Sequence, residues 1–502
     1  MEIQVLRPFI GGKFVESKAG RYMDIYDPSV GSVIAKTPCC TAEEVEQAIL
    51  AAKAAFPAWR DTPCAKRVEV LYRFRDLLVA HMDELTYLLC RENGKNWDEA
   101  QGDLLKVKEP VEVACGAPSL MMGESFMNVT SGFDSTLYRE PLGVFAGIVP
   151  FNFPAMIPMG WMMPMCIATG NTLVLKAASM TPMTSLRLVE LLQEAGLPGG
   201  VVNIVTCSRR EAELLLTHPD VKGVTFVGST EIGKHIYTTA AAHGKRVQAL
   251  CEAKNHALVL EDAPIERTAA GIINSSFGCA GERCMALPAI AVQESIADEL
   301  VAEILKQIKT KKVGPAYDKA TDLGPVVTAA HKTFVSDWIQ KGIDEGAKLL
   351  LDGRNVKVPG YENGFYLGHT VFDHITPEMT VGQSEIFGPV LCVKRVKDFE
   401  DGIAQMNANR FANGSVIFTQ SGYYAREFAR RTDGGMVGVN VGIPVPAGMF
   451  PFAGHKDSFF GDLHALGKDG MRFYTESKVV TTRWFHEEEK KVKKVSTWDG
   501  AL

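Results

Sequence analysis

Residues 172–205 read TLVLKAASMTPMTSLRLVELLQEAGLPGGVVNIV, and this stretch decides the fold class. It begins with a short apolar run (172–176) and ends with another (201–205), and both are typical of β-strands. Between them, residues 184–195 have a helical pattern that Gly196 and Pro198 terminate. Strand, helix and strand at this spacing indicate two parallel strands joined by a crossover helix.

The same pattern extends on both sides of this stretch. Further apolar runs occur at 144–149 (VFAGIV), 223–228 (GVTFVG) and 256–260 (HALVL). A second series begins with AIAVQE at 289–294 and a helix over 296–308. Because 502 residues exceed what one hydrophobic core usually supports, we predict an α/β chain with two α/β domains. Residues 125–138 and 478–485 alternate like strands outside both series.

Three other segments carry structural predictions. Residues 41–56 (TAEEVEQAILAAKAAF) predict an amphipathic helix that starts with a capping box of Thr41 and Glu44. A second long helix is expected from Lys66 to about Leu89. The most apolar run, 156–168, is interrupted by two prolines and a glycine and is too short to cross a bilayer as a regular helix. We expect this run to be buried.

Composition narrows the possible functions. The chain is 46% hydrophobic and 22% charged, and its net charge of −6 comes without a basic block, which argues against a nucleic-acid partner. The N-terminal residues lack the apolar core and cleavage site of a secretory signal, and we expect no membrane association. Eleven scattered cysteines fit the reduced thiols of a cytoplasmic protein better than a disulfide framework.

Several short stretches hold candidate chemical groups. In FGCAGERCMAL (277–287), Cys279 and Cys284 are five residues apart, a spacing unlike that of zinc ligands, so no metal site is expected and Cys284 is either an inert thiol or a nucleophile. The strand at 223–228 leads into a helix through a turn that has Gly228 and Gly233 five residues apart. Backbone amides at such a helix start can bind a phosphate, although a plain tight turn explains the glycines equally well.

Taken together, these stretches resemble the aldehyde dehydrogenase superfamily in the expected order over nearly the whole chain. The matching motifs are PFNFP (150–154), LVLK (173–176), FVGSTEIG (226–233), GERC (281–284), EIFGP (385–389) and PFAG (451–454). The resemblance implies the aldehyde dehydrogenase fold, with two Rossmann-like α/β domains and a small bridging β-element that holds a homo-tetramer or dimer together. The implied division is a dinucleotide-binding domain (1–124 and 143–250), a catalytic domain (251–464) and an oligomerisation element (125–142 and 465–502).

The resemblance also assigns roles to individual residues. Cys284 matches the nucleophile that attacks the aldehyde and becomes a thioester. Asn152 matches the side chain that, with the backbone N–H of Cys284, stabilises the oxyanion. Cys279 is then a packed small hydrophobe. The implied cofactor site consists of Pro150, Phe151, Lys176, Ser179, Arg209, Gly228, Ser229, Gly233, Leu250, Glu385 and Phe387.

A closer resemblance is to the methylmalonate-semialdehyde dehydrogenase branch. It is carried by GAPSLMMGES (116–125), AKNHALVLEDA (253–263), PFAGHKDSFFGDLHALGKDG (451–470) and FYTESKVVTTRW (473–484). The branch uses NAD, oxidises malonate or methylmalonate semialdehyde, and transfers the acyl group to coenzyme A with decarboxylation. Leu250 falls where hydrolytic relatives carry a glutamate base, and leucine cannot activate water, so the thioester should survive until a thiol attacks it.

This chain departs from the branch at three places. Of the two arginines expected for the substrate carboxylate, Arg283 is present but the other is Lys106, which leaves another carboxylated or a sulfonated aldehyde possible. Ser179 replaces a ribose-binding glutamate, and with Arg209 this favours tolerance of NADP. Glu252 lies where a small residue is usual and is a candidate substitute base. The alternatives are a hydrolytic, NADP-linked dehydrogenase and an inactive binding protein on the same fold.

Overall fold

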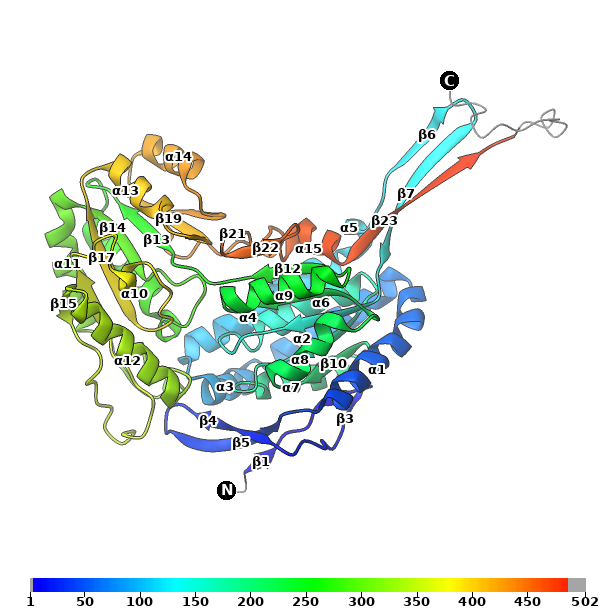
Figure 1. Ribbon diagram of the computed structural model, residues 1–502, viewed down its shortest axis with the longest axis horizontal. Coiled ribbons are helices and arrows are strands. Elements are labelled where there is room, and N and C mark those ends of the chain that lie inside the picture. Colours follow the sequence, from blue (N-terminus) through cyan, green and yellow to red (C-terminus); the bar gives the residue numbers. More distant parts are fainter. Residues whose placement is uncertain (1–2, 486–502) are drawn as a thin grey trace.

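The computed structural model describes residues 3–485, which form two α/β bodies side by side and a β-arm that projects from one of them (Figure 1). The predicted α/β class is confirmed. Each body contains a sheet with a parallel centre, and the arm is a separate antiparallel sheet. Among the described residues, no helix combines the length and apolarity that crossing a membrane requires.

The first sheet contains the two strands of the stretch 172–205. Its strands lie in the order β22 (Phe459–Gly461), β12 (Arg246–Leu250), β11 (Val221–Val227), β8 (Val144–Ile148), β9 (Thr172–Lys176), β10 (Val202–Val205), β2 (Phe9–Ile10) and β3 (Lys13–Phe14). The five strands from β12 to β10 are parallel. Chain order runs from β8 outward through β9 to β10 and then returns to β11 on the other side, so the connections reverse between β8 and β11. Ligands of such sheets bind outside the carboxyl ends of the strands at this reversal.

Helices cover both faces of the first sheet. Leu173 and Leu175 pack with one helical layer, and Val174 between them packs with the other, as the period of two in a strand requires. The first layer contains α2 (Cys64–Ala80), α3 (Met82–Asn93), α4 (Trp97–Cys115), α6 (Met163–Ala168) and α7 (Met183–Glu194). The second contains α1 (Ala42–Asp61), α8 (Arg209–Thr217) and α9 (Thr230–Ala242).

The second sheet has a parallel centre and one antiparallel edge strand, β15. Its order is β15 (Lys348–Leu351), β16 (Thr370–Asp373), β17 (Val390–Val396), β14 (Ala289–Gln293), β13 (His256–Val259), β19 (Gly414–Phe418) and β20 (Met436–Val439). Around it lie α10 (Ile265–Phe277), α11 (Glu294–Ile308), α12 (Ala329–Asp344), α13 (Phe399–Asn407) and α14 (Gly422–Arg431). Two small sheets complete the topology, β1 (Gln4–Val5) with β5 (Ser32–Pro38) and β4 (Tyr22–Asp27), and β18 (Phe411–Ala412) with β21 (His455–Lys456).

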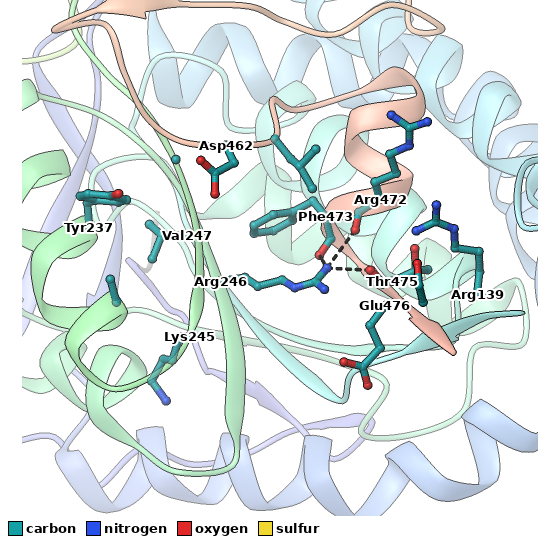
Figure 2. Close-up of a pocket in the computed structure, with 14 residues that line it drawn as sticks. Arg139, Tyr237, Lys245, Arg246, Val247, Asp462, Arg472, Phe473, Thr475 and Glu476 are labelled. Carbon is teal, nitrogen blue, oxygen red and sulfur yellow. Dashed lines mark hydrogen bonds between the residues drawn. The ribbon is translucent and has the colours of Figure 1, made fainter. Parts of the chain in front are cut away.

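The arm consists of β6 (Ser125–Thr130), β7 (Phe133–Pro141) and β23 (Thr475–Arg483), in the order β23-β7-β6. The strands predicted at 125–138 and 478–485 are therefore present, while residues 486–502 of the predicted oligomerisation element lie outside the described residues. Arg246 secures the root of the arm, since its Nη1 donates to the carbonyl oxygens of Arg472, Phe473 and Thr475 at 2.9, 3.0 and 2.6 Å. Figure 2 shows these bonds in a pocket of about 540 Å³ between α9, the short helix α15 (Gly467–Phe473) and β23.

Local predictions were mostly correct. Helix α1 has the predicted capping box, with Thr41 N donating to Glu44 Oε2 at 2.7 Å, and continues past Pro57 to Asp61. The single helix expected from Lys66 to Leu89 was wrong, because His81 leaves helical geometry (φ −102°, ψ 17°) and separates α2 from α3. The apolar run 156–168 is buried as a π-helical segment, Met156–Met162, followed by α6.

Candidate active site

Cys284 lies in the loop between α10 and β14 and lines a pocket of about 400 Å³. Arg283, Lys106, Phe153 and Trp161 line the same pocket. The structure thus brings together the predicted nucleophile and both residues predicted to bind the substrate's acid group. Its walls combine these cations with aromatic and aliphatic side chains and with two acidic residues, Glu99 and Asp103, of which Asp103 pairs with Lys95 at 2.8 Å. A pocket of this composition can bind a small polar organic molecule.

The backbone before Cys284 adopts a strained conformation. Cys279, Ala280 and Gly281 all have left-handed φ angles, of 51°, 52° and 74°. Such angles are unfavourable for Cys279 and Ala280, and strain of this kind persists only where neighbouring contacts hold it. One such contact is at Gly281, where a Cβ would lie 2.1 Å from the carbonyl oxygen of Gly388, so only glycine fits. Cys279 is buried, as predicted for a packed thiol, although it also lines the pocket.

The surroundings of Cys284 keep its thiol protonated in the absence of ligands. Burial raises the pKa of the Cys284 thiol to about 12, and the charge of Glu385 adds to that effect. The backbone of Cys284 is anchored separately, since its carbonyl oxygen accepts a hydrogen bond from Asn255 Nδ2 at 2.9 Å. The loop therefore positions a thiol whose reactivity depends on a charge or base supplied near it.

Asn152 is buried between the first sheet and the Cys284 loop. Its Nδ2 donates to the carbonyl oxygen of Glu282 at 3.0 Å, while its Oδ1 has no hydrogen-bond partner. An amide nitrogen carries two hydrogens, so Nδ2 retains one donor beyond the bond to Glu282. An incompletely satisfied amide beside the nucleophile is the arrangement expected of a ligand-binding group.

The two residues predicted to bind the substrate's acid group differ in the partners of their side chains. Arg283 Nη2 donates to the carbonyl oxygens of Asn274 and Ser275 at 2.7 and 3.2 Å, whereas its buried Nε has no partner. Lys106 Nζ lies 2.6 Å from Glu109 Oε2. The charge of Lys106 is therefore partly neutralised by Glu109, a residue that sequence reasoning missed although it follows Lys106 by three positions on α4.

Residues predicted to bind the cofactor gather at the reversal point of the first sheet. Pro150 follows β8 by two residues, and Gly228 and Ser229 follow β11 directly, so they lie at the two strands between which the connections reverse. Lys176 and Leu250 end β9 and β12. Because the four strands are parallel, their carboxyl ends share one edge of the sheet, where a dinucleotide is expected to bind.

A second group joins Phe151, which follows β8 of the first sheet, to Glu385 and Phe387, which precede β17 of the second. The rings of Phe151 and Phe387 meet edge to face with centroids 5.8 Å apart, and Phe387 has a left-handed φ of 59°. Glu385 Oε1 accepts a hydrogen bond from Ala253 N at 3.3 Å. Burial, followed by the charge of Glu252, raises the pKa of Glu385 well above its ordinary value. These side chains offer a carboxylate and an aromatic surface that fit a ribose and a nicotinamide.

Three further residues predicted to bind the cofactor, Gly233 within α9, Ser179 after β9 and Arg209 at the start of α8, also follow strands of the first sheet. Gly233 packs against β12 so closely that a Cβ would lie 2.2 Å from the Sγ of Cys251. Ser179 is half-buried after β9, and Arg209 begins α8 with an exposed side chain. Neither of the last two has a contact that relates it to a phosphate, and their roles remain predictions.

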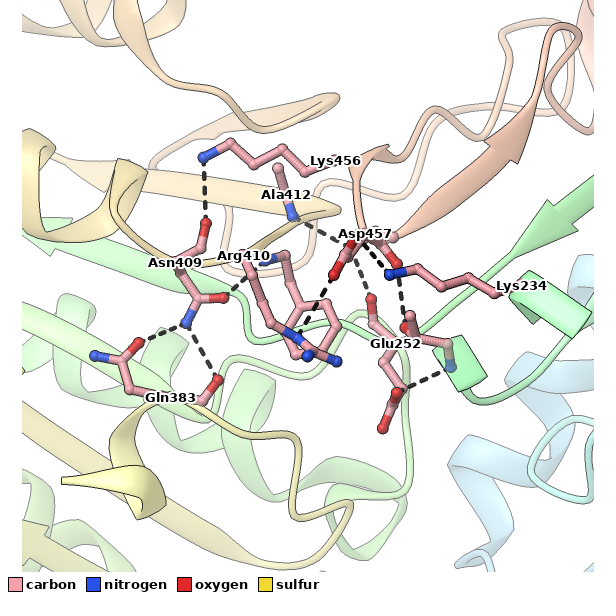
Figure 3. A network of polar contacts seen from close by, with 11 residues as sticks. Lys234, Glu252, Gln383, Asn409, Arg410, Ala412, Lys456 and Asp457 are labelled. Atoms are coloured by element: carbon pink, nitrogen blue, oxygen red, sulfur yellow. Dashed lines mark hydrogen bonds and ion pairs between the residues drawn. The ribbon is translucent and has the colours of Figure 1, made fainter. Parts of the chain in front are cut away.

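Glu252, the candidate substitute base, caps a helix and does not contact Cys284. Its Oε2 accepts a hydrogen bond from Thr230 N, the first residue of α9, at 2.9 Å. It belongs to a polar network around the turn Asp457–Ser458 (Figure 3). This turn bonds to Thr230 and Glu252, which follow strands of the first sheet, and to Ala412, which precedes β19 of the second sheet. Its carboxylate is thus used at the start of a helix, and no contact connects it with Cys284.

Comparison with known proteins agrees with this arrangement. The aldehyde dehydrogenase family model matches residues 14–480. Malonate-semialdehyde dehydrogenase 1 of Oceanobacillus iheyensis is 47% identical over 484 residues, which is 96% of this chain and 99% of the relative. The crystal structure of methylmalonate-semialdehyde dehydrogenase from Oceanimonas doudoroffii superposes with a TM-score of 0.95 at 44% identity, covering 97% of this chain and 100% of that one. A Sinorhizobium meliloti protein complexed with NAD has the same TM-score at 41% identity, covering 97% and 99%.

Proposed function

The chain belongs to the aldehyde dehydrogenase family and has its fold, and from that premise we propose that it is a coenzyme A-acylating dehydrogenase of malonate or methylmalonate semialdehyde. The observation that carries the proposal is the pocket of about 400 Å³ in which Cys284 lies with Arg283 and Lys106. A nucleophile next to two cations suits an aldehyde that bears an acid group.

Arg283 and Lys106 would hold the substrate's carboxylate. Arg283 lines the pocket and keeps a buried Nε without a hydrogen-bond partner, which a carboxylate oxygen that reached it would satisfy. Lys106 contributes a more exposed charge at the same pocket, moderated by Glu109. A short semialdehyde held in this way would present its carbonyl carbon to Cys284.

Cys284 and Asn152 would then perform the covalent steps. The Cys284 sulfur forms a bond to the carbonyl carbon, and the carbonyl oxygen gains negative charge that Asn152 Nδ2 and the backbone N–H of Cys284 stabilise. Bound NAD or NADP would accept the hydride that leaves this carbon, and its positive nicotinamide would favour the Cys284 thiolate. The remaining acyl group is a thioester on Cys284.

Leu250 supports coenzyme A as the acyl acceptor. It is 3% exposed and packs in the hydrophobic core, at the position where hydrolytic relatives carry their base. No group at this position can activate a water molecule, so the thioester would persist until the thiol of coenzyme A attacks it. The β-carboxylate then leaves as carbon dioxide, because the electron pair is stabilised as a thioester enolate.

The decisive experiment follows the products from malonate semialdehyde with and without coenzyme A. We expect acetyl-coenzyme A, formed with one NADH or NADPH per aldehyde, and no product from the Cys284→Ala variant, which should still bind the cofactor. Rapid release of a free acid without coenzyme A would instead favour the hydrolytic alternative. Replacing NAD by NADP in the same assay tests the cofactor, since Ser179 lacks the carboxylate that would repel a 2′-phosphate.

We further propose that the chain forms a homo-oligomer through the arm and is cytoplasmic. Phe126, Met127, Val479 and Val480 are exposed on the arm, which has no covering layer within the described chain. A second copy of this chain is the simplest cover for such a sheet. All eleven cysteines are free, as expected in a reducing compartment.

A further inference from the structure

Glu252 lies next to the proposed cofactor site, and the proposed mechanism has no use for it. It follows β12 by two residues. Its carboxylate is half-buried and accepts the hydrogen bond from Thr230 N. Thr230 is the first residue of α9, and α9 begins directly after Gly228 and Ser229, the residues expected to receive the cofactor's pyrophosphate.

The hydrogen-bond acceptor that caps the start of α9 does not come from the N-cap residue. Ser229 occupies the N-cap position, and its own hydroxyl makes no capping bond. The capping acceptor instead comes from Glu252, 22 residues further along the chain. Helix starts attract anions through free N–H groups and the helix dipole, so a carboxylate and a phosphate compete for the same place.

The Glu252 carboxylate is also not neutralised by a neighbouring cation. Among residues 3–485, no lysine, arginine or histidine forms an ion pair with it, although Lys234 lies on α9, the helix that Glu252 caps. Lys234 Nζ lies 3.3 Å from Asp457 Oδ1 instead, as Figure 3 shows. Burial, followed by the charge of Glu252, raises the pKa of Glu385 well above its ordinary value, as expected of a carboxyl group near an unneutralised carboxylate.

The network holds the backbone of Glu252 beside the start of α9. Its backbone carbonyl oxygen accepts a hydrogen bond from Ser458 Oγ at 2.6 Å, and Thr230 Oγ1 donates to the carbonyl oxygen of Asp457 at 3.1 Å. The loop that carries Glu252 and the helix start that it caps are therefore both tied to the turn Asp457–Ser458. The backbone on both sides of the contact is thus fixed, whereas the Glu252 carboxylate is held by the hydrogen bond from Thr230 N and can rotate away without breaking the network.

We propose that Glu252 is an internal competitor of the cofactor's phosphates: it caps α9 in the free chain and must be displaced when a dinucleotide binds. The inference rests on the proposed use of NAD or NADP at this site. It makes Glu252 an affinity-determining residue that weakens dinucleotide binding and speeds cofactor release. A purely structural cap would stabilise α9 without affecting affinity.

The test compares full-length wild type with Glu252→Gln, Glu252→Ala and the matched control Glu231→Gln. Glu231 is an exposed acid in the first turn of the same helix, but it makes no bond to the Thr230 amide. Titration of NADH fluorescence should show a Kd at least about fivefold lower for both Glu252 variants, the scale of one charge at a helix start. Glu231→Gln should change the Kd by less than about twofold, because its charge is solvated.

Calorimetry with ADP-ribose and with adenosine locates the effect. The gain should persist with ADP-ribose, which retains both phosphates, and vanish with adenosine, which has none. A gain with NADH alone would mean that Glu252 acts on the nicotinamide, and unchanged or weaker binding in the Glu252 variants would also overturn the proposal. If wild type bound neither NADH nor NADPH, the proposed function itself would fail, so the two failures are distinguishable.

Discussion

At the scale of single residues, the site combines a protonated nucleophile with an unsatisfied amide. Burial raises the pKa of Cys284, and Asn152 keeps an Oδ1 without a partner. The unpartnered Oδ1 is costly in a folded protein, and a strongly raised thiol pKa is typical of functional sites, so both features are expected where a ligand completes the arrangement. Asn152 is held by Glu282, whose carboxylate accepts a hydrogen bond from Val327 N at 3.1 Å.

The thiol environment predicts a steep pH dependence of alkylation. With the thiol pKa raised to about 12, the reactive thiolate is scarce at neutral pH in the cofactor-free chain. Inactivation by iodoacetamide should therefore accelerate about tenfold for each pH unit between about pH 7 and about pH 10. Stopped-time activity assays measure this rate, and peptide mass analysis identifies the alkylated cysteine. A rate that levels off near neutral pH would contradict the predicted environment.

The oxyanion role of Asn152 is tested by Asn152→Ala. Loss of one oxyanion donor should lower the rate of thioester formation by roughly 10²- to 10³-fold. Single-turnover measurement of NADH release is the appropriate assay, with NADH affinity as the control that should stay near the wild-type value. An unchanged burst rate would show that Asn152 does not face the developing charge.

At the scale of elements, helix α4 carries both a cation that lines the pocket and the acid that pairs with it. Lys106 lines the pocket, and Glu109 pairs with it while also accepting a hydrogen bond from Gly448 N at 2.7 Å. The acid thus joins α4 to the segment that contributes Ile443 and Val445 to the pocket wall. The carboxylate of Glu109 therefore links the charge of Lys106 to the position of the pocket wall near Gly448.

This coupling predicts opposite effects of two substitutions on α4. Glu109→Gln keeps an acceptor for Gly448 but releases the charge of Lys106, so KM for malonate semialdehyde should fall by up to about fivefold, the upper range for a partly exposed ion pair. Lys106→Gln should raise that KM by a similar factor. Propanal, which has no acid group, is the control substrate. Equal effects on both aldehydes would remove Lys106 from the substrate site.

The start of helix α1 gives a stability prediction. Thr41 and Glu44 exchange backbone hydrogen bonds in a capping box, and α1 packs on the first sheet through Val45, Ala48 and Ile49. Thr41→Ala should lower the free energy of unfolding by about 1 kcal/mol. Urea unfolding followed by circular dichroism measures the change. Thr41→Ser, which retains the hydroxyl, should restore most of it.

At the scale of the whole molecule, the arm is the part that residues 3–485 leave uncovered. Its three strands extend away from both α/β bodies in Figure 1, and hydrophobic side chains are exposed along them. Arg246 fixes its direction through three carbonyl oxygens at the root. A sheet with two open faces and a fixed direction is suited to pairing with another subunit.

A charge on the arm should therefore change the assembly. Val479→Asp, at a side chain that is 62% exposed, should shift the protein toward smaller species in sedimentation velocity while its circular dichroism stays native. Ala302→Asp, on the exposed side of α11, is the matched control and should leave the assembly unchanged. Identical sedimentation of both variants and wild type would exclude the arm from the interface.

The sequence by itself determined what depends on neighbours along the chain. The strand, helix and strand of 172–205 and the capping box at Thr41 were predictable because period and capping are local properties. The order of the motifs also sufficed for the family and for the expectation that Cys284 lies in the active site. The break at His81 was missed, because the residues around it have no helix-breaking proline or glycine.

Only the tertiary structure decided which distant groups meet. The bond from Thr230 to Glu252 depends on the adjacency of β11 and β12, and the contact of Glu109 with Gly448 joins residues 339 positions apart. The neutralised charge of Lys106 and the occupied start of α9 follow from these contacts. Sheet order and loop packing set such distances through the balance of burial over the whole molecule, and no local pattern encodes that balance.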